Sequence, residues 1–180
     1  MIRDSFPQFS KFSAIASKHP AELIQRSLTL IWQEAEDCKA DDALIWLLSA
    51  PELRFAAGES KDSSRYAPAE SLIKRFAENC SAPVLDDLQQ KIEGYKDPVV
   101  VENYKRYLKE QYYRLYFDFR NELGLAQYVL FSAIPDESRS VVARRRVNEG
   151  VEKFGGLPKP RLRHEGGIVQ SSIPLSLIHI

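Results

Sequence analysis

The sequence predicts an all-α protein, and three observations favour this class. Apolar residues recur mostly three and four positions apart, which is the spacing of one face of a helix. The alternation of apolar and polar residues that marks a half-buried strand is nearly absent. Glycine is scarce, and five of its 8 occurrences lie between positions 150 and 167, so the preceding chain can form uninterrupted helices.

Two helices are expected before position 36. The first spans residues 5–19, with Pro7 in its first turn, and it ends there because the residue before Pro20 avoids the helical region. Pro20 then opens the second helix. Its apolar face is expected to comprise Leu23, Ser27, Leu30, Ile31 and Ala35, widened by Leu28 and Trp32.

A short, nearly all-apolar helix at residues 43–48 is expected to be buried between its neighbours. Asp41 or Asp42 is expected to cap its start, and Pro51 to end it. Residues 51–67 are expected to form a long connection, in which residues 60–65 are exposed and mobile.

Two further amphipathic helices follow this connection. Pro68 opens the first, which ends near Asn79 with Leu72, Ile73 and Phe76 facing inward. Ser81 caps the second, which has Pro83 in its first turn and ends at Gly94. Its apolar stripe comprises Val84, Leu85, Leu88 and Ile92.

The longest helix is predicted at about residues 102–120, after Asp97-Pro98. A helical segment at 123–134 follows and ends at Pro135. Ser138 or Ser140 is expected to cap the last helix, which runs to Phe154 and is terminated by Gly155-Gly156. Residues 157–174, with three prolines and two adjacent glycines, indicate extended, irregular chain.

These helices pair in order as hairpins roughly 35–45 residues long, within the period range of HEAT-like repeats. Because residue identities do not repeat, an irregular α-solenoid and a compact helical bundle both remain open, and we favour the solenoid. The predicted organisation is a helical array at 1–156, an extended irregular segment at 157–174 and a separate tail at 175–180.

Composition indicates a folded protein without a dominant charge. Apolar residues make up 44% and charged residues 28%, with 25 basic and 25 acidic side chains, which argues against wholesale disorder. The balance argues against a dedicated nucleic-acid or membrane binder. Residues 1–100 nevertheless carry a net charge of −4 and residues 101–180 a net charge of +4.

The sequence from Met1 shows no signal peptide, and two unclustered cysteines suit a reducing compartment, so we expect a cytoplasmic protein.

Catalytic motifs are missing from the sequence. It contains no phosphate-binding loop, no dinucleotide-binding glycine motif and no nucleophile elbow. His164-Glu165 begins a zinc-protease motif, but Ile168 stands where the second histidine is needed. A pair of Cys38 or Cys80 with His19 or His164 has no local signature, and Asp41-Asp42 and Asp86-Asp87 suit the first turns of helices. We therefore assign no catalytic, cofactor-binding or metal-binding residue and expect a non-enzymatic protein that needs no cofactor.

Two basic features are candidate interaction sites. The helix at 102–120 interleaves tyrosine with basic residues, which is typical of a stacking surface for single-stranded nucleic acid. We favour the alternative that its face at 104, 108, 112, 115 and 119 is core, because the helix also carries acids. The second feature holds eight cations and two acids between positions 138 and 163: Arg139, Arg144, Arg145, Arg146, Lys153, Lys159, Arg161 and Arg163. This segment suits either a nucleic-acid backbone or docking on the acidic N-terminal half or an adjoining domain, and we favour docking.

Short runs from position 124 onward are similar to a known pattern. They are Gly124-Leu125-Ala126-Gln127-Tyr128, Ile134-Pro135, Arg144-Arg145, Phe154-Gly155 and Gly166-Gly167-Ile168-Val169-Gln170-Ser171-Ser172-Ile173-Pro174. Together they resemble a stretch in the helical C-terminal arrays of large bacterial signal-transduction ATPases of the STAND, or NACHT-like, type. Ser172 stands where that pattern has proline. The resemblance implies a helical sensor region without chemistry of its own, in a protein whose ATPase precedes Met1 and whose relatives include phage-defence proteins.

The terminal hexapeptide Leu175-Ser176-Leu177-Ile178-His179-Ile180 has a separate resemblance. It resembles the translation of the adapter used in transposase-based DNA library preparation. We therefore expect residues 175–180 to be a non-native tail.

The sequence thus favours a non-enzymatic helical scaffold or ligand-sensing segment of a larger cytoplasmic protein. Its expected partners are adjoining domains of the same longer chain or a protein ligand, and no membrane. The alternative is a small helical nucleic-acid-binding protein that uses the basic segment at 138–163.

Overall fold

A computed structural model describes residues 22–35, 38–58, 63–109 and 123–156. Every regular element in these ranges is helical, which confirms the all-α class. The predicted helix at 5–19, the second half of the 102–120 helix and residues 157–180 lie outside the described ranges. The elements are α2 (Glu22–Glu34), α3 (Ala40–Leu48), α4 (Pro51–Arg54), the 3-10 turn η1 (Ser63–Tyr66), α5 (Ala67–Phe76), α6 (Ala82–Gly94), α7 (Pro98–Lys109), α9 (Leu125–Ser132), the 3-10 turn η3 (Asp136–Ser138) and α10 (Val141–Phe154).

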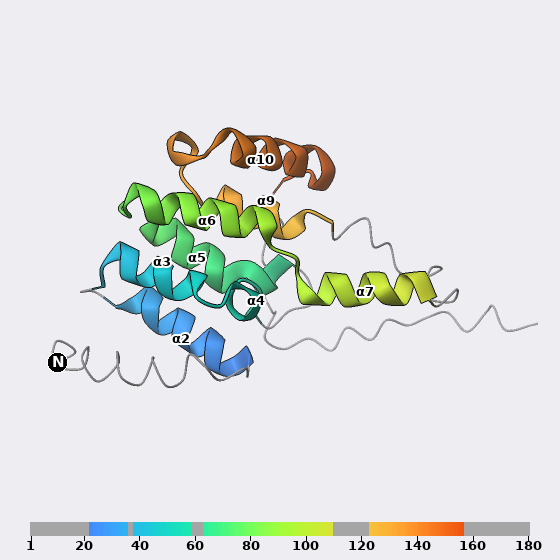
Figure 1. The fold of residues 1–180 in the computed structure, drawn as a ribbon, viewed down its shortest axis with the longest axis horizontal. Coiled ribbons are helices and arrows are strands. Elements are labelled where there is room, and N and C mark those ends of the chain that lie inside the picture. Colours follow the sequence, from blue (N-terminus) through green and yellow to red (C-terminus); the bar gives the residue numbers. More distant parts are fainter. Residues whose placement is uncertain (1–21, 36–37, 59–62, 110–122, 157–180) are drawn as a thin grey trace, which may run out of the picture.

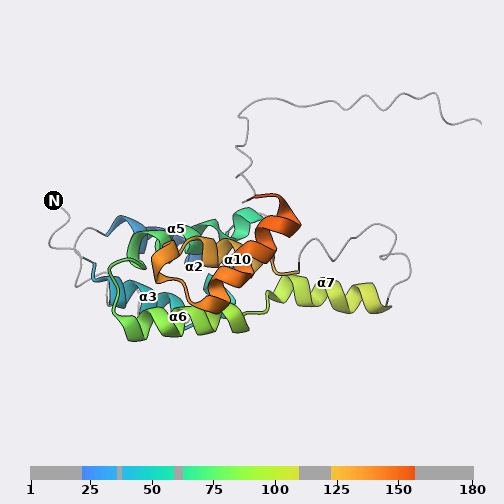
Figure 2. The same cartoon turned by 90° about the horizontal axis from the view of Figure 1, so that it is seen from above.

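All of these helices except α7 stack side by side (Figure 1). Helix α5 contacts α2, α3 and α9, while α9 also contacts α6 and carries α10 on its outer side. Helix α7 leaves the end of α6 and extends away from the stack, as the view from above also shows (Figure 2). In a solenoid each repeat contacts only its neighbours, whereas these contacts join helices both near to and far from each other in the sequence. The solenoid arrangement therefore stays a prediction.

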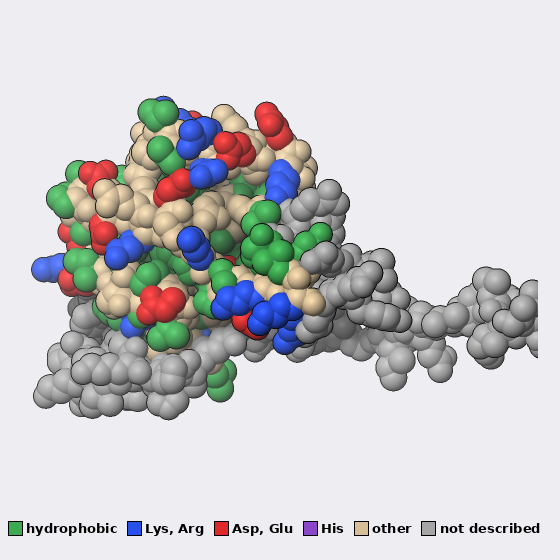
Figure 3. Space-filling model, turned by 45° about the vertical axis from the view of Figure 1, so that its right-hand side comes forward, with side chains coloured by type: hydrophobic (Ala, Val, Ile, Leu, Met, Phe, Trp, Pro, Cys, Tyr) green, Lys and Arg blue, Asp and Glu red, His purple; other side chains and the backbone are tan. Residues whose placement is uncertain are grey.

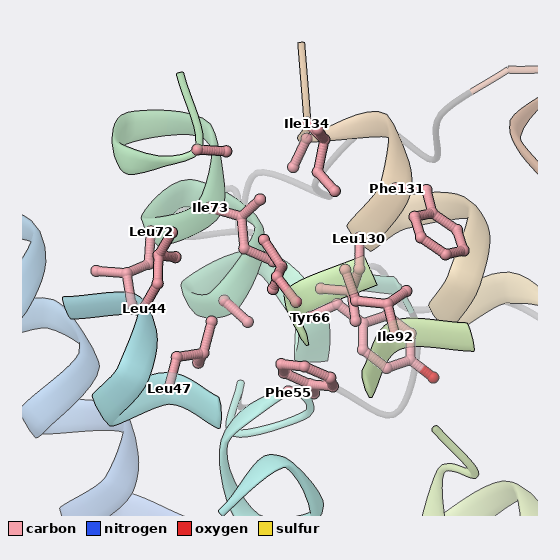
Figure 4. Close-up of a cluster of buried hydrophobic side chains, with 14 of the residues drawn as sticks. Leu44, Leu47, Phe55, Tyr66, Leu72, Ile73, Ile92, Leu130, Phe131 and Ile134 are labelled. Carbon is pink, nitrogen blue, oxygen red and sulfur yellow. The ribbon is translucent and has the colours of Figure 1, made fainter. Parts of the chain in front are cut away.

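One contiguous apolar core joins the stacked helices. It includes Leu44 and Leu47 of α3, Ile73 of α5, Ile92 of α6 and Leu130 of α9, all fully buried (Figure 4). Burying one such side chain contributes roughly 1.5–3 kcal/mol before the entropy of ordering is counted. The inward stripes predicted for α5 and α6 are confirmed because their residues belong to this core or pack against it.

The inward face predicted for α2 is confirmed at Leu28 and Trp32, which are buried, and is wrong at most of its other described members. Leu23 is 69% exposed and Ile31 41% exposed, whereas Gln25 and Thr29 are fully buried beside Leu28. Gln25 faces inward because its Oε1 accepts a hydrogen bond of 2.9 Å from Nε of the buried Arg54. A buried arginine needs such acceptors, so a polar residue takes an inward position that the apolar pattern did not predict.

The predicted roles of the paired aspartates need correction. Helix α3 begins at Ala40, so Asp41 and Asp42 do lie in its first turn, but neither is its cap residue. Instead, Oδ1 of Asp41 accepts a 2.7 Å hydrogen bond from the backbone N–H of Ser81 at the start of α6. Helix α6 has no acid in its first turn because it begins at Ala82, which places Asp86-Asp87 in the second turn.

The ends of α10 agree with the sequence prediction. Ser140 is the cap, and its hydroxyl accepts a 3.2 Å hydrogen bond from the N–H of Ala143. The helix ends at Phe154, followed by Gly155 with φ of 70°, a left-handed conformation that glycine adopts without strain.

Candidate interaction surface

A buried ion pair fixes the start of α7 to the stacked helices. Nε of Arg65 lies 2.9 Å from Oδ2 of Asp97, and both side chains are under 5% exposed. The hydroxyl of Tyr66 donates a short hydrogen bond to the same carboxylate oxygen. The other oxygen of Asp97 accepts the N–H of Val99 at 2.8 Å, which caps the first turn of α7. The expectation that Arg65 is exposed is therefore wrong, because it compensates a buried carboxylate.

Tyrosine side chains surround this ion pair. Burial raises the pKa of Tyr66 far above its usual value. The charge of Arg65 lowers this pKa, while the hydrogen bond to Asp97 and the charge of Asp97 raise it. Tyr95 is 7% exposed and packs edge-on against Phe55 at 5.1 Å between ring centroids. The amide Nε2 of Gln127 donates a 2.7 Å hydrogen bond to the Tyr95 carbonyl and so ties α9 to the same place. We call Arg65, Tyr66, Tyr95 and Asp97 the root of α7, and its buried ion pair brings opposite charges together.

Beyond this root, α7 exposes apolar side chains. None of its residues is buried, and Val99, Tyr104 and Leu108 are 47%, 43% and 52% exposed. The expectation that the face containing positions 104 and 108 is core is wrong within the described part of that helix. The start at Pro98 also precedes the predicted start at about 102.

A hollow of about 720 Å³ lies between α7 and the start of α9, and we call it the α7–α9 groove. Its walls are mainly apolar: Val100, Val101, Tyr104 and Leu108 come from α7, and Leu123 and Ala126 from the α9 side. Lys96 and Lys105 also line it and are exposed. Figure 3 shows apolar side chains gathered beside basic ones on this side of the molecule.

A second hollow of about 380 Å³ adjoins the α7–α9 groove. The two share Leu123, Gly124 and Gln127, and the second is completed by α10 residues including Arg146, Glu149 and Lys153. The surface is therefore continuous from α7 across the start of α9 to α10.

Intramolecular partners engage much of the predicted basic segment. The guanidinium of Arg139 donates to the carbonyls of Phe131, Ser132 and Ile134 at 3.0, 3.1 and 2.8 Å, which satisfies the C-terminal end of α9. Lys153 donates a 2.7 Å hydrogen bond to the carbonyl of Leu123. These two cations have structural roles.

Arg146 of α10 pairs with an acid of α6, which belongs to the acidic N-terminal half of the chain. A contact of this kind is what the docking prediction expects. The guanidinium of Arg146 lies 2.7 Å from Glu93 and 3.0 Å from Glu149, and these hydrogen bonds raise its pKa further above the usual value. Arg145 lies 3.7 Å from Glu149, and Arg144 donates to the Asp136 carbonyl at 3.4 Å. Lys159, Arg161 and Arg163 lie outside the described residues.

The described part of the chain brings together no catalytic constellation that we can recognise. Burial, with the charge of Asp42, raises the pKa of Cys38 to about 11, and burial also raises the pKa of Cys80. Both therefore remain thiols at neutral pH, which makes them poor nucleophiles. Within these ranges, no three histidine, cysteine or acidic side chains are grouped as metal ligands. His19 and His164 lie outside them.

Across the described helices, none is long and apolar enough to cross a membrane.

The sequence contained one usable signal for this surface. Asp97 directly precedes Pro98, and an aspartate before a first-turn proline is a helix-start signature. Nothing local marks Arg65, Tyr95 or Gln127, because their roles depend on contacts between residues far apart in the chain.

No protein-family model, curated protein or solved structure matches this chain.

Proposed function

We propose that this chain is a non-enzymatic helical scaffold that binds a protein partner through the α7–α9 groove. The observation that carries this proposal is the exposure of an apolar helix, α7, beside a hollow of about 720 Å³. Exposed apolar surface is costly in water, and contiguous patches of it mark interaction sites.

Two further features support a binding role. The root of α7 is anchored by the buried pair of Arg65 and Asp97, so the groove has one fixed wall at its inner end. The resemblance to sensor regions of STAND-type ATPases favours the same role, with the partner being either a protein ligand or an adjoining domain of a longer chain.

Selection from a displayed library of helical peptides tests this function while the partner is still unidentified. Enriched peptides should bind the chain and lose at least about tenfold in affinity on Leu123→Glu, which places a charge in the apolar wall. The matched control is Ile45→Glu on α3, where the side chain is 53% exposed and does not line the groove. Equal loss in both variants, or no enrichment at all, would contradict the proposal.

Nucleic-acid binding is the second candidate function. It is favoured by the exposed cations Lys105, Arg106 and Lys109 beside Tyr104 on α7. It predicts binding of a single-stranded oligonucleotide that weakens steeply between about 50 and 200 mM salt. The engagement of Arg139, Arg146 and Lys153 by groups of this chain makes it the weaker candidate.

A further inference from the structure

The chemistry of the α7–α9 groove defines the class of partner that fits it. We propose that the groove binds an acidic amphipathic helix of another protein. This inference rests on the proposed scaffold function and adds the charge and shape of the occupant.

The shape of the groove favours a helix. Helix α7 has 12 residues, so at 1.5 Å per residue it is about 18 Å long. Val100, Tyr104 and Leu108 follow each other at four-residue spacing and form one ridge, opposite Leu123 and Ala126. Two apolar walls of this kind accept the apolar face of a third helix.

The charge around the groove favours an acidic occupant. Among the described residues that line it, Lys96 and Lys105 are the exposed charged side chains. Asp97 also lines it, but it is 5% exposed and is neutralised by Arg65. On α7, Arg106 and Lys109 add exposed positive charge, against one exposed acid, Glu102, which lies 3.9 Å from Lys105. A partner with glutamates beside its apolar stripe matches this rim, while one with lysines is repelled.

The walls also discriminate against nucleic acid. Their described apolar residues are mostly aliphatic, whereas unpaired bases bind by stacking on aromatic rings. A helical partner instead gains from burying valine and leucine side chains.

The test uses two designed peptides of about 18 residues that share one leucine stripe. One carries glutamate and the other lysine at the flanking positions. Affinity for the full chain is measured by fluorescence anisotropy. We expect the glutamate peptide to bind about tenfold more tightly, with the preference shrinking as salt rises. Lys96→Glu with Lys105→Glu should reverse the preference. The matched control, Lys74→Glu with Lys91→Glu on α5 and α6, should leave it unchanged.

Each other outcome identifies a different occupant and overturns the inference. Equal binding of both peptides, lost on Leu123→Glu, would retain the scaffold function and reject the acidic partner. If neither designed peptide binds but library-selected helices still do, the scaffold function is likewise retained and the acidic partner rejected. Self-association of the chain that Leu123→Glu abolishes would indicate a second copy. Binding only to anionic lipid vesicles or oligonucleotides would reject the scaffold function as well.

Discussion

Helices α7 and α10 are both amphipathic and of similar length, with 12 and 14 residues, but they are held in different ways. Helix α10 packs on α9 along its length: Gly150 lies against Tyr128, whose ring stacks on Phe154 at 5.7 Å. Helix α7 has no buried residue and is anchored at its first turn by Asp97. Amphipathic spacing therefore predicts a helix without saying how far its apolar face is buried.

The largest effect is expected at the anchor of α7. Asp97→Ala leaves the guanidinium of Arg65 buried without its carboxylate, so the free energy of unfolding should fall by about 3–5 kcal/mol. Chemical denaturation measures this change. The double variant Arg65→Met with Asp97→Leu removes both charges and should recover part of the loss. No recovery would show that the charge imbalance is not the cause.

The close packing of α10 predicts the next effect. A Cβ added at Gly150 would lie 2.7 Å from Cβ of Tyr128, closer than real contacts allow. Gly150→Ala should therefore destabilise the fold by about 1–3 kcal/mol, despite the better helix propensity of alanine. Gly94→Ala is the matched control in α6, because its Cβ would meet nothing within 4 Å. Thermal unfolding that shows equal effects for both would contradict the packing of α10 on α9.

Loss of the α10 cap should have a smaller effect. Ser140→Ala removes the hydroxyl that accepts the N–H of Ala143, at a cost of about 1 kcal/mol. Ser140→Thr keeps an acceptor and should retain most of the stability. If both variants unfold at the wild-type midpoint, the Ser140 hydroxyl does not cap α10.

The smallest effect is expected on the exposed face of α7. Val99 is 47% exposed, so Val99→Ala should change the free energy of unfolding by less than about 0.5 kcal/mol. Val129→Ala makes the same chemical change in α9, where the side chain is 2% exposed, and should cost about 2 kcal/mol. A cost at Val99 equal to that at Val129 would show that α7 is packed as tightly as the core.

Sequence reasoning succeeded where local chemistry decides the structure. Pro68, Pro83, Ser140 and Gly155 mark helix ends through their own backbone or side-chain properties, and these boundaries are confirmed within a few residues. The all-α class follows from the same local signals.

Sequence reasoning failed where a buried polar group from a distant element decides which residues face inward. The inward face of α2 depends on Arg54, and the burial of Arg65 depends on Asp97, 32 residues later in the chain. For the candidate site, the basic segment was visible in the sequence, but the engagement of Arg139 and Arg146 and the groove beside α7 required the fold.

Native-state hydrogen exchange tests the central claim that α7 presents a binding face while α10 belongs to the core. In the free chain, amides of residues 102–109 should exchange faster than those of residues 145–154, because local opening of α7 exposes little apolar surface. The glutamate peptide should protect residues 102–109 and leave α10 unchanged. Equal protection of both helices in the free chain, with no change on adding the peptide, would contradict the account.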